Sequence, residues 1–352
     1  LVKELATTLC VRVVAPGRVE AHERAAERIE IFRYAAPAKP LSTLKPWNPV
    51  DAFWLARVLR GGARATRAAV AAGATAHVFA LWGLPSGEWA RRAAAQRGLA
   101  YSVWLLGSDV WTLGRLPIAR GLLTCVLREA AHRYADGHRL AADARAIGGT
   151  QVEFLPSTRA LETRTPPPLP RPAPPYRLLF LGRWHPNKGV DILLDALAIL
   201  ADADWQRIDA IDIAGGGPLH ELVHARVAAL QTAGRPVRLK GFLAKTEAEA
   251  AMARADWVLI PSRIESIPLV FSDAMRVGRP VICSPVGDLP IVAQDVGVVA
   301  RAATPEAWRD ALRAALGGTP PDAAVIAARA AEFSLENVTG RLRRALLPGV
   351  AA

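Results

Sequence analysis

Short runs of apolar residues alternate with amphipathic stretches throughout the second half of the chain. Each run ends in a glycine or a polar turn, and the apolar positions after it recur at helical spacing. The runs that predict buried strands are residues 178–181, 211–214, 257–260 and 281–283, and residues 237–243 hold one more strand with its loop. Strands that alternate with helices predict an α/β fold, with a parallel sheet covered by helices on both faces.

The same alternation is present in the first half of the chain. The strands predicted there are residues 10–15, 28–34, 77–82, 101–106, 136–141 and 151–155. A proline-rich stretch, residues 165–175, separates the two halves and predicts a semi-rigid linker. We therefore expect residues 1–164 to form one domain and residues 176–330 a second, followed by a helical tail, residues 331–352.

An acidic motif lies between residues 255 and 290. A predicted strand runs into a polar turn that holds Glu265, and Asp273 stands about one turn inside the next helix. The backbone N–H groups that lie between these two carboxylates at the helix N-terminus belong to Ser266, Ile267 and Leu269. Ligands of α/β folds bind at the carboxyl ends of strands, and helix N-termini attract phosphate. The motif predicts a nucleotide-sugar site; the alternative is a generic βαβ unit with two solvated acids.

A basic loop follows the strand at residues 178–181. The strand ends in Gly182, and Arg183 and Lys188 lie in the turn before an amphipathic helix. Arginine offers phosphate a bidentate fork and lysine offers a point charge, so the two can bind a diphosphate. The alternative is an exposed turn with ordinary surface charges. Further along, Gly215 and Gly216 open a glycine-rich turn in which the backbone can approach a ligand closely.

Taken together, these motifs resemble those of retaining glycosyltransferase family 4. That family has the GT-B fold, in which two Rossmann-like domains face an interdomain cleft. Its Pro-Ser, Glu, seven residues, Glu pattern is matched by Pro261, Ser262 and Glu265, with Asp273 in place of the second Glu. The Gly-Arg…Lys-Gly loop and the glycine-rich turn also occur in the family's order. The resemblance covers nearly the whole chain and is strongest between residues 178 and 289.

The resemblance implies a role for each motif residue. Arg183 and Lys188 would stabilise the leaving nucleoside diphosphate, Glu265 would hold the hexose, and Asp273 would bind the ribose. Further contacts to the donor would come from Gly182, Gly215, Gly216, Leu243, Ser266, Ile267 and Leu269. The family uses no protein nucleophile, so catalysis rests on positioning and on stabilisation of the departing phosphate. We expect no metal and no cofactor, and a UDP or GDP type of sugar donor.

The first half carries a weaker part of the resemblance. Residues 104–111 are similar to the family's His-Gly-Ser-Asp-Val stretch, and Gly107 and Asp109 are predicted to face the cleft. Leu106 replaces the histidine that often contacts the donor sugar, which favours an altered sugar preference. The alternative for Asp109 is an N-cap of the following turn. The resemblance also implies that the tail, residues 331–352, crosses back to the first domain.

The composition of the chain limits which partners it can bind and in which cellular compartment it is expected. The net charge is +12 and the pI is about 10.4, which suits an anionic donor, an anionic membrane surface or nucleic acid. No nucleic-acid-binding signature is present, so we do not expect nucleic acid. The three cysteines lie far apart without metal-ligand spacing, which indicates reduced thiols in the cytoplasm. No apolar run is long enough to cross a membrane.

A basic stripe is predicted near residue 50. Asn48 and Pro49 predict the start of a helix. The basic residues that follow at alternating spacings of three and four are Arg57, Arg60, Arg64 and Arg67. On an unbroken helix they form a stripe that can lie on anionic lipid, at the inner face of the plasma membrane. We expect Gly61 and Gly62 to break this helix, and the alternative is a solvated face over an ordinary core.

The start of the chain lacks a feature that the resemblance implies. Family members have a strand and a glycine-rich turn before the helix that residues 1–9 resemble. We expect that a central strand of the first sheet precedes residue 1 in a longer gene product. Without it, backbone groups of both neighbouring strands would be unpaired.

The sequence thus predicts a hexosyltransferase that uses a nucleoside-diphosphate sugar. Its acceptor would be a hydroxyl of a lipid-linked, polysaccharide or small molecule, for example in the cell envelope. Two alternatives stay open. One is a catalytically decayed GT-B protein that binds nucleotide sugars, and the other is a nucleotide-sugar epimerase of the same fold.

Overall fold

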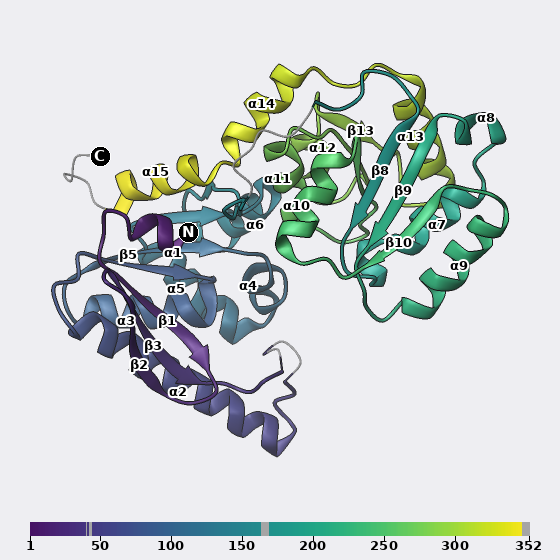
Figure 1. Cartoon of the computed structure of the whole chain (residues 1–352). Coiled ribbons are helices and arrows are strands. Elements are labelled where there is room, and N and C mark those ends of the chain that lie inside the picture. The colour runs from purple at the N-terminus through teal and green to yellow at the C-terminus, as the bar shows by residue number, and fades with distance from the viewer. Residues whose placement is uncertain (40, 42–43, 163–168, 347–352) are drawn as a thin grey trace. The chain divides into compact units, whose positions relative to one another are not determined.

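The computed structural model describes residues 1–39, 41, 44–162 and 169–346. It divides into two compact units: unit 1 comprises Leu1–Leu155 with Thr339–Ala352, and unit 2 comprises Pro156–Val338 (Figure 1). Residues 165–168 of the predicted linker, and its predicted boundary at residue 164, lie outside the described residues. The last helix, α15 (Leu335–Leu346), begins in unit 2 and ends in unit 1.

Unit 2 is a doubly wound α/β domain built on one parallel sheet. Its strands are β8 (Tyr176–Leu181), β9 (Ile208–Ala214), β10 (Val237–Gly241), β11 (Trp257–Ile260), β12 (Val281–Cys283) and β13 (Gly297–Val299). Their order in the 6-stranded sheet is β10-β9-β8-β11-β12-β13, and every neighbouring pair is parallel. The chain therefore moves outward from β8 in one direction and then restarts beside it at β11. This confirms the strands and the parallel sheet predicted for this half.

Helices cover both faces of this sheet. They are α7 (Val190–Ala198), α8 (Asp202–Trp205), α9 (His220–Thr232), α10 (Lys245–Arg254), α11 (Leu269–Arg276), α12 (Leu289–Val292), α13 (Pro305–Gly317) and α14 (Ala323–Glu332). Side chains of α7, α9 and α13 share one core cluster with the strands, while α10, α11 and α12 lie together in Figure 1. The central strand β11 is buried along its whole length, which explains its uninterrupted apolar sequence.

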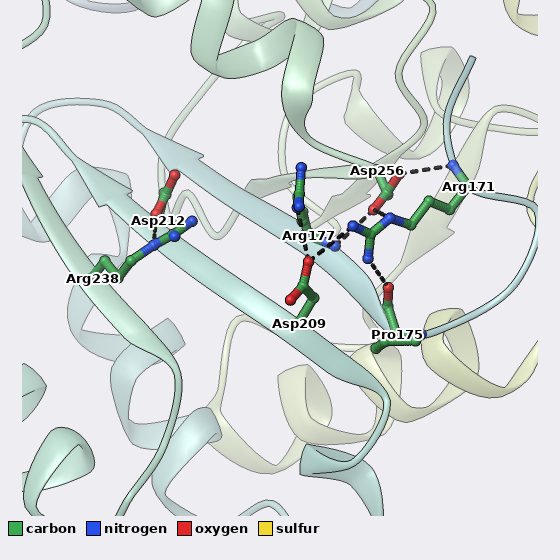
Figure 2. Close-up of polar contacts among 7 residues, drawn as sticks. All are labelled: Arg171, Pro175, Arg177, Asp209, Asp212, Arg238 and Asp256. Carbon is green, nitrogen blue, oxygen red and sulfur yellow. Dashed lines mark hydrogen bonds and ion pairs between the residues drawn. The ribbon is translucent and has the colours of Figure 1, made fainter. Parts of the chain in front are cut away.

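A polar network anchors the amino ends of the central strands (Figure 2). Asp256, just before β11, is 4% exposed and accepts hydrogen bonds from the backbone N–H groups of Arg171 (2.8 Å) and Arg177 (2.7 Å). The guanidinium groups of the same two arginines donate to Asp209 Oδ2 at 2.9 and 2.8 Å. One buried carboxylate thus fixes the segment before β8 to the sheet, at the end opposite to the loops described below.

Unit 1 contains two sheets. Parallel strands β4 (His77–Leu81), β5 (Ala100–Leu105), β6 (His132–Ala135) and β7 (Glu153–Phe154) form one sheet in that order. The other has the order β1-β3-β2, with β1 (Val11–Gly17) parallel and β2 (Ala21–Ala26) antiparallel to β3 (Ile29–Ala35). The helices of this unit, besides the end of α15, are α1 (Val2–Leu5), α2 (Pro49–Ala71), α3 (Glu88–Ala95), α4 (Ser108–Trp111), α5 (Pro117–Glu129) and α6 (His138–Gly148).

Three expectations for unit 1 are wrong. The predicted parallel sheet is instead two sheets. One of them is mixed, because the fully exposed strand β2 forms a hairpin with β3. The strand predicted at residues 136–141 is a turn and the start of α6, whereas β6 lies just before it. Gly61 and Gly62 do not break α2, which runs through both. Gly62 lets Trp89 pack against the helix, because an alanine Cβ at position 62 would lie 2.1 Å from the Trp89 ring.

None of the described helices is long and apolar enough to cross a membrane. Among the described residues, no group of three or more His, Cys, Asp or Glu side chains is placed to hold a metal ion.

Candidate functional site

The strand order of unit 2 places its candidate site between the carboxyl ends of β8 and β11. The sheet order reverses between these two neighbours, and ligands of open α/β sheets bind at such a switch point. The basic loop follows β8 and the acidic motif follows β11. The structure therefore brings together two motifs that are about 80 residues apart in the sequence.

Close backbone packing joins the two loops. Gly189, with φ +65°, ends the turn that holds Lys188, and an alanine Cβ there would lie 1.8 Å from the carbonyl oxygen of Pro261. The Arg263 N–H donates to the carbonyl oxygen of Asn187 at 2.8 Å. Only glycine at position 189 permits this approach. The glycine of the Lys-Gly pair therefore serves to pack the two loops together and not to contact a ligand.

Lys188 and Glu265 form an ion pair across these loops. The Lys188 ammonium donates to Glu265 Oε2, and the side chains are 34% and 17% exposed, respectively. Arg183 is exposed in the same loop, and no hydrogen bond or ion pair of its side chain is present among the described residues. The switch point thus holds one neutralised cation and one cation that is open to an anionic ligand.

The glycine-rich turn after β9 packs on the basic loop. An alanine Cβ at Gly215, which has φ +141°, would lie 1.9 Å from the Gly182 carbonyl oxygen, and one at Gly217 would lie 2.7 Å from that of Trp184. The Trp184 N–H also donates to the Gly216 carbonyl oxygen at 2.9 Å. Gly215 and Gly217 therefore position the loop that carries Arg183, while nothing lies within 4 Å of a Cβ built at Gly216.

The N-terminus of α11 lies directly after the Glu265 loop. Leu269 is its first residue and Pro268 its N-cap, with Ser266 and Ile267 in the turn before it. The buried Ser266 hydroxyl has no hydrogen-bond partner among the described residues. Gly287, with φ +57°, packs on the same turn, because its Cβ would lie 2.0 Å from the Glu265 carbonyl oxygen. Loops from three neighbouring strands thus hold this turn.

Asp273 has a partner that sequence reasoning missed. Its carboxylate, 3% exposed, accepts two hydrogen bonds from the Arg159 guanidinium, one of them at 3.3 Å to Oδ1. Burial raises the pKa of Asp273, and the hydrogen bond from Arg159 opposes that shift. Arg276 in turn donates to the Arg159 carbonyl oxygen. No sequence signal links positions 114 residues apart, so only the fold reveals this contact.

The remaining predicted residues lie in two places. Leu243, after β10, is half-buried in unit 2. Asp109 lies in unit 1 and is fully buried, where its carboxylate accepts from the N–H groups of Gly83 (2.7 Å), Gly107 (3.0 Å) and Val110 (3.2 Å). Burial raises the pKa of Asp109, and the backbone N–H donors of Gly83 and Gly107 oppose the shift. The N-cap of α4 is Gly107, so the alternative that named Asp109 as N-cap is wrong.

Comparison with known proteins shows what the chain is similar to. Residues 175–317 match the family model described as Glycosyl transferases group 1. A D-inositol 3-phosphate glycosyltransferase of Corynebacterium glutamicum (strain R) is 35% identical over 138 residues, which are 38% of this chain and 33% of that protein. The chain thus spans about a third of the length of this curated relative.

Two solved structures resemble the chain over most of its length. Sucrose-phosphate synthase from Thermosynechococcus elongatus has a TM-score of 0.69 and 17% identity, covering 98% of this chain and 92% of that one. Anabaena HepE in complex with UDP and glucose has a TM-score of 0.59 and 15% identity, covering 90% and 85%. The chain has the GT-B fold of the glycosyltransferases among its structural neighbours, as predicted from the sequence.

Proposed function

We propose that this chain, whose residues 175–317 belong to the glycosyl transferases group 1 family, is a retaining hexosyltransferase. It would move a hexose from a nucleoside-diphosphate sugar to a hydroxyl group of its acceptor. One observation carries the proposal: Arg183, Lys188 and Glu265 lie on adjoining loops at the switch point of the unit 2 sheet. Cations for a diphosphate and a carboxylate for sugar hydroxyls are the groups that such a donor requires.

In the proposed reaction the C1–O bond to the diphosphate breaks, and a bond forms between C1 and the acceptor oxygen on the same face. The proton of the acceptor hydroxyl passes to the departing phosphate oxygen. Arg183 and Lys188 stabilise the negative charge of the leaving group, and the N-terminus of α11 adds its dipole. Glu265 orients the hexose through its hydroxyl groups, and no residue of the chain needs to act as a nucleophile.

The donor and the acceptor are proposed by class. Anabaena HepE was solved with UDP and glucose, which supports a UDP-hexose donor over the GDP type. The curated relatives are named for D-inositol 3-phosphate, which supports a phosphorylated hydroxyl compound among small-molecule acceptors. A lipid-linked or polysaccharide acceptor, as in cell-envelope synthesis, is the other class. The nucleotide sugar is a substrate, so no resident cofactor is part of the proposal.

Calorimetric titration with UDP, GDP, ADP and their hexose conjugates tests the donor site. We expect one series to bind, and we expect Arg183→Ala and Lys188→Ala each to weaken binding by about tenfold or more. Arg313→Ala is the matched control, because this arginine pairs with Asp204 at 3.2 Å on the surface of unit 2. Absence of binding to every nucleotide, or equal losses in the control, would contradict the donor site.

Product analysis separates the enzyme from its alternatives. Transfer to an acceptor, with NMR showing that the anomeric configuration is kept, supports the retaining transferase. Tight binding without transfer or hydrolysis would identify a decayed binding protein. Conversion of the sugar without an acceptor would identify an epimerase of the same fold.

For the acceptor side we propose an anionic membrane surface as a partner of helix α2. The helix is unbroken, and the Asn48 side chain accepts from the N–H groups of Val50 and Asp51 at its start. Apolar side chains lie exposed at this end: Trp47 (79%), Val50 (64%) and Phe53 (58%). The exposed arginines that continue this face of the helix are Arg57, Arg60, Arg64 and Arg67. An apolar tip followed by a basic stripe is typical of a helix in the headgroup region of a bilayer.

A hollow beside the stripe strengthens this proposal. It has a volume of about 570 Å³ and is lined by Val19, Phe53, Arg57, Arg60 and Arg64, and also by Glu20, which pairs with Arg64 at 3.2 Å. Such a lining suits a phosphate headgroup with an apolar neighbour. A nucleotide-sugar enzyme on this surface would work in the cytoplasm, peripherally at the inner face of the plasma membrane.

Co-sedimentation with vesicles tests the membrane proposal. At low salt we expect binding to vesicles of anionic lipid, and we expect Arg57→Glu/Arg60→Glu to abolish it. Arg97→Glu/Arg301→Glu changes the net charge equally at exposed positions outside α2 and should retain binding. Equal binding to neutral vesicles, or equal loss in both double variants, would contradict a specific role of α2.

A further inference from the structure

The switch point is already occupied by an internal ion pair. Lys188 is one of the two cations proposed to bind the diphosphate, yet its ammonium donates to Glu265. Both side chains are partly buried, being 34% and 17% exposed. A diphosphate that binds Lys188 must therefore compete with Glu265. When an anion binds here, Lys188 exchanges the Glu265 carboxylate for the anion.

The backbone that carries the Glu265 carboxylate is held in place when this exchange takes place. Glu265 lies on a turn fixed on one side by Arg263, whose guanidinium binds both carboxylate oxygens of Asp191 at 2.8 and 2.7 Å. On the other side Gly287 packs against the Glu265 backbone. Lys188, in contrast, has a flexible four-carbon side chain. We therefore expect Lys188 to turn to the phosphate while Glu265 stays in place.

A carboxylate left in this position needs a new partner. Among the described residues, Lys188 is the only one that donates to the Glu265 side chain. A partly buried carboxylate without a hydrogen-bond partner raises the free energy of the protein. Hydroxyl groups that donate hydrogen bonds to it remove this cost. The sugar of a nucleotide-sugar donor supplies such hydroxyls beside the diphosphate. A bare nucleoside diphosphate does not.

We propose that Glu265 is a specificity-determining residue that makes the site bind the sugar donor in preference to the bare nucleoside diphosphate. This inference rests on the proposed function. With the donor bound, the hexose hydroxyls replace Lys188 as the partners of Glu265. After transfer the sugar is gone, and Glu265 competes again for Lys188. The ion pair thus weakens binding of the product and favours its release.

Paired titrations of UDP and UDP-glucose test the inference. In the wild-type protein we expect UDP-glucose to bind more tightly than UDP. In Glu265→Gln we expect UDP to bind about five- to tenfold more tightly, because no carboxylate competes for Lys188. Binding of UDP-glucose should stay equal or weaken, so the preference is lost. Glu306→Gln, an exposed position on α13, removes the same charge elsewhere and should change neither affinity.

A double-mutant cycle distinguishes competition at Lys188 from a general change in charge or fold. In a Lys188→Ala background, Glu265→Gln should no longer strengthen UDP binding, because the group that the carboxylate competes for is absent. An increase of equal size in both backgrounds would overturn the inference. So would unchanged or weaker UDP binding in Glu265→Gln alone, with the donor site itself left intact. If the wild-type protein binds neither UDP nor UDP-glucose, both the inference and the proposed UDP donor fail.

Discussion

Two carboxylates that are eight residues apart in the sequence, Glu265 and Asp273, differ in how readily a ligand can replace their present partners. Glu265 is 17% exposed and pairs with a flexible lysine, so a ligand can take over its interaction. Asp273 is 3% exposed and is held by two hydrogen bonds from Arg159. Its predicted role at the ribose stays a prediction, and that role requires Arg159 to yield. The contacts therefore favour Glu265 as the ligand-binding carboxylate and Asp273 as an anchor of the segment that contains Arg159.

His77 gives a prediction at the same scale. Its Nε2 lies 2.8 Å from the buried Ser102 hydroxyl, and burial, followed by the charge of His132, lowers the pKa of His77 from its usual 6.5 to about 4. Between these values the unfolded chain binds a proton that the folded chain does not. Stability is thus complete above pH 6.5 and falls as the pH is lowered towards 4. We expect a loss on the order of 2 kcal/mol in unit 1, after allowance for solvent screening.

Urea unfolding from pH 4.5 to 7 measures this effect. The variant His77→Gln keeps a polar side chain without a charge change in this range. Its unfolding free energy should vary less with pH than that of the wild-type protein. Parallel pH profiles of the two proteins would show that another group controls the acid sensitivity.

At the scale of elements, glycines decide how the loops of the site pack. Gly215 and Gly216 are adjacent, yet a Cβ at position 215 would lie 1.9 Å from the Gly182 carbonyl oxygen and one at position 216 would meet no atom within 4 Å. We expect Gly215→Ala to displace the Arg183 loop, to lower stability by about 2 kcal/mol or more, and to weaken nucleotide binding. Gly216→Ala should leave stability nearly unchanged.

Thermal unfolding and nucleotide titration of the two glycine variants check this expectation. The comparison isolates backbone packing, because both variants add the same methyl group to neighbouring residues. Equal tolerance of alanine at both positions would contradict the close approach of the two loops.

The elements also show what sequence patterns can predict. The strands of unit 2 were predicted because β8, β11 and β12 are apolar runs that end at a glycine or a polar turn. Strand β2 was missed because all of its residues are exposed, so it has no apolar alternation. The prediction of a strand at residues 136–141 was wrong. The actual strand, β6, has the sequence His-Arg-Tyr-Ala and therefore carries little apolar signal. Contacts such as Arg159 with Asp273 depend on the fold and have no local signature.

At the scale of the whole molecule, the groups that stabilise unit 2 and the groups proposed to bind its ligand lie at opposite ends of the same sheet. The buried Asp256 network lies at the amino ends of the strands (Figure 2). The switch-point loops lie at their carboxyl ends. Units 1 and 2 also have separate hydrophobic clusters, which include Leu105 and Leu259, respectively. We therefore expect the two units to unfold in two separate transitions. A nucleotide that binds unit 2 should raise the Tm of one of them.

Scanning calorimetry with and without the nucleotide checks this last prediction. At about 100 times the dissociation constant, we expect the Tm of one transition to rise by about 5 °C or more, while the other stays in place. Asp256→Asn should lower the Tm of that same transition, because two backbone N–H groups lose a charged acceptor. The nucleotide-induced rise should survive in this variant, since the mutated carboxylate lies away from the site. A nucleotide effect that vanishes in Asp256→Asn, or that raises both transitions equally, would show that the two ends of the sheet do not act separately.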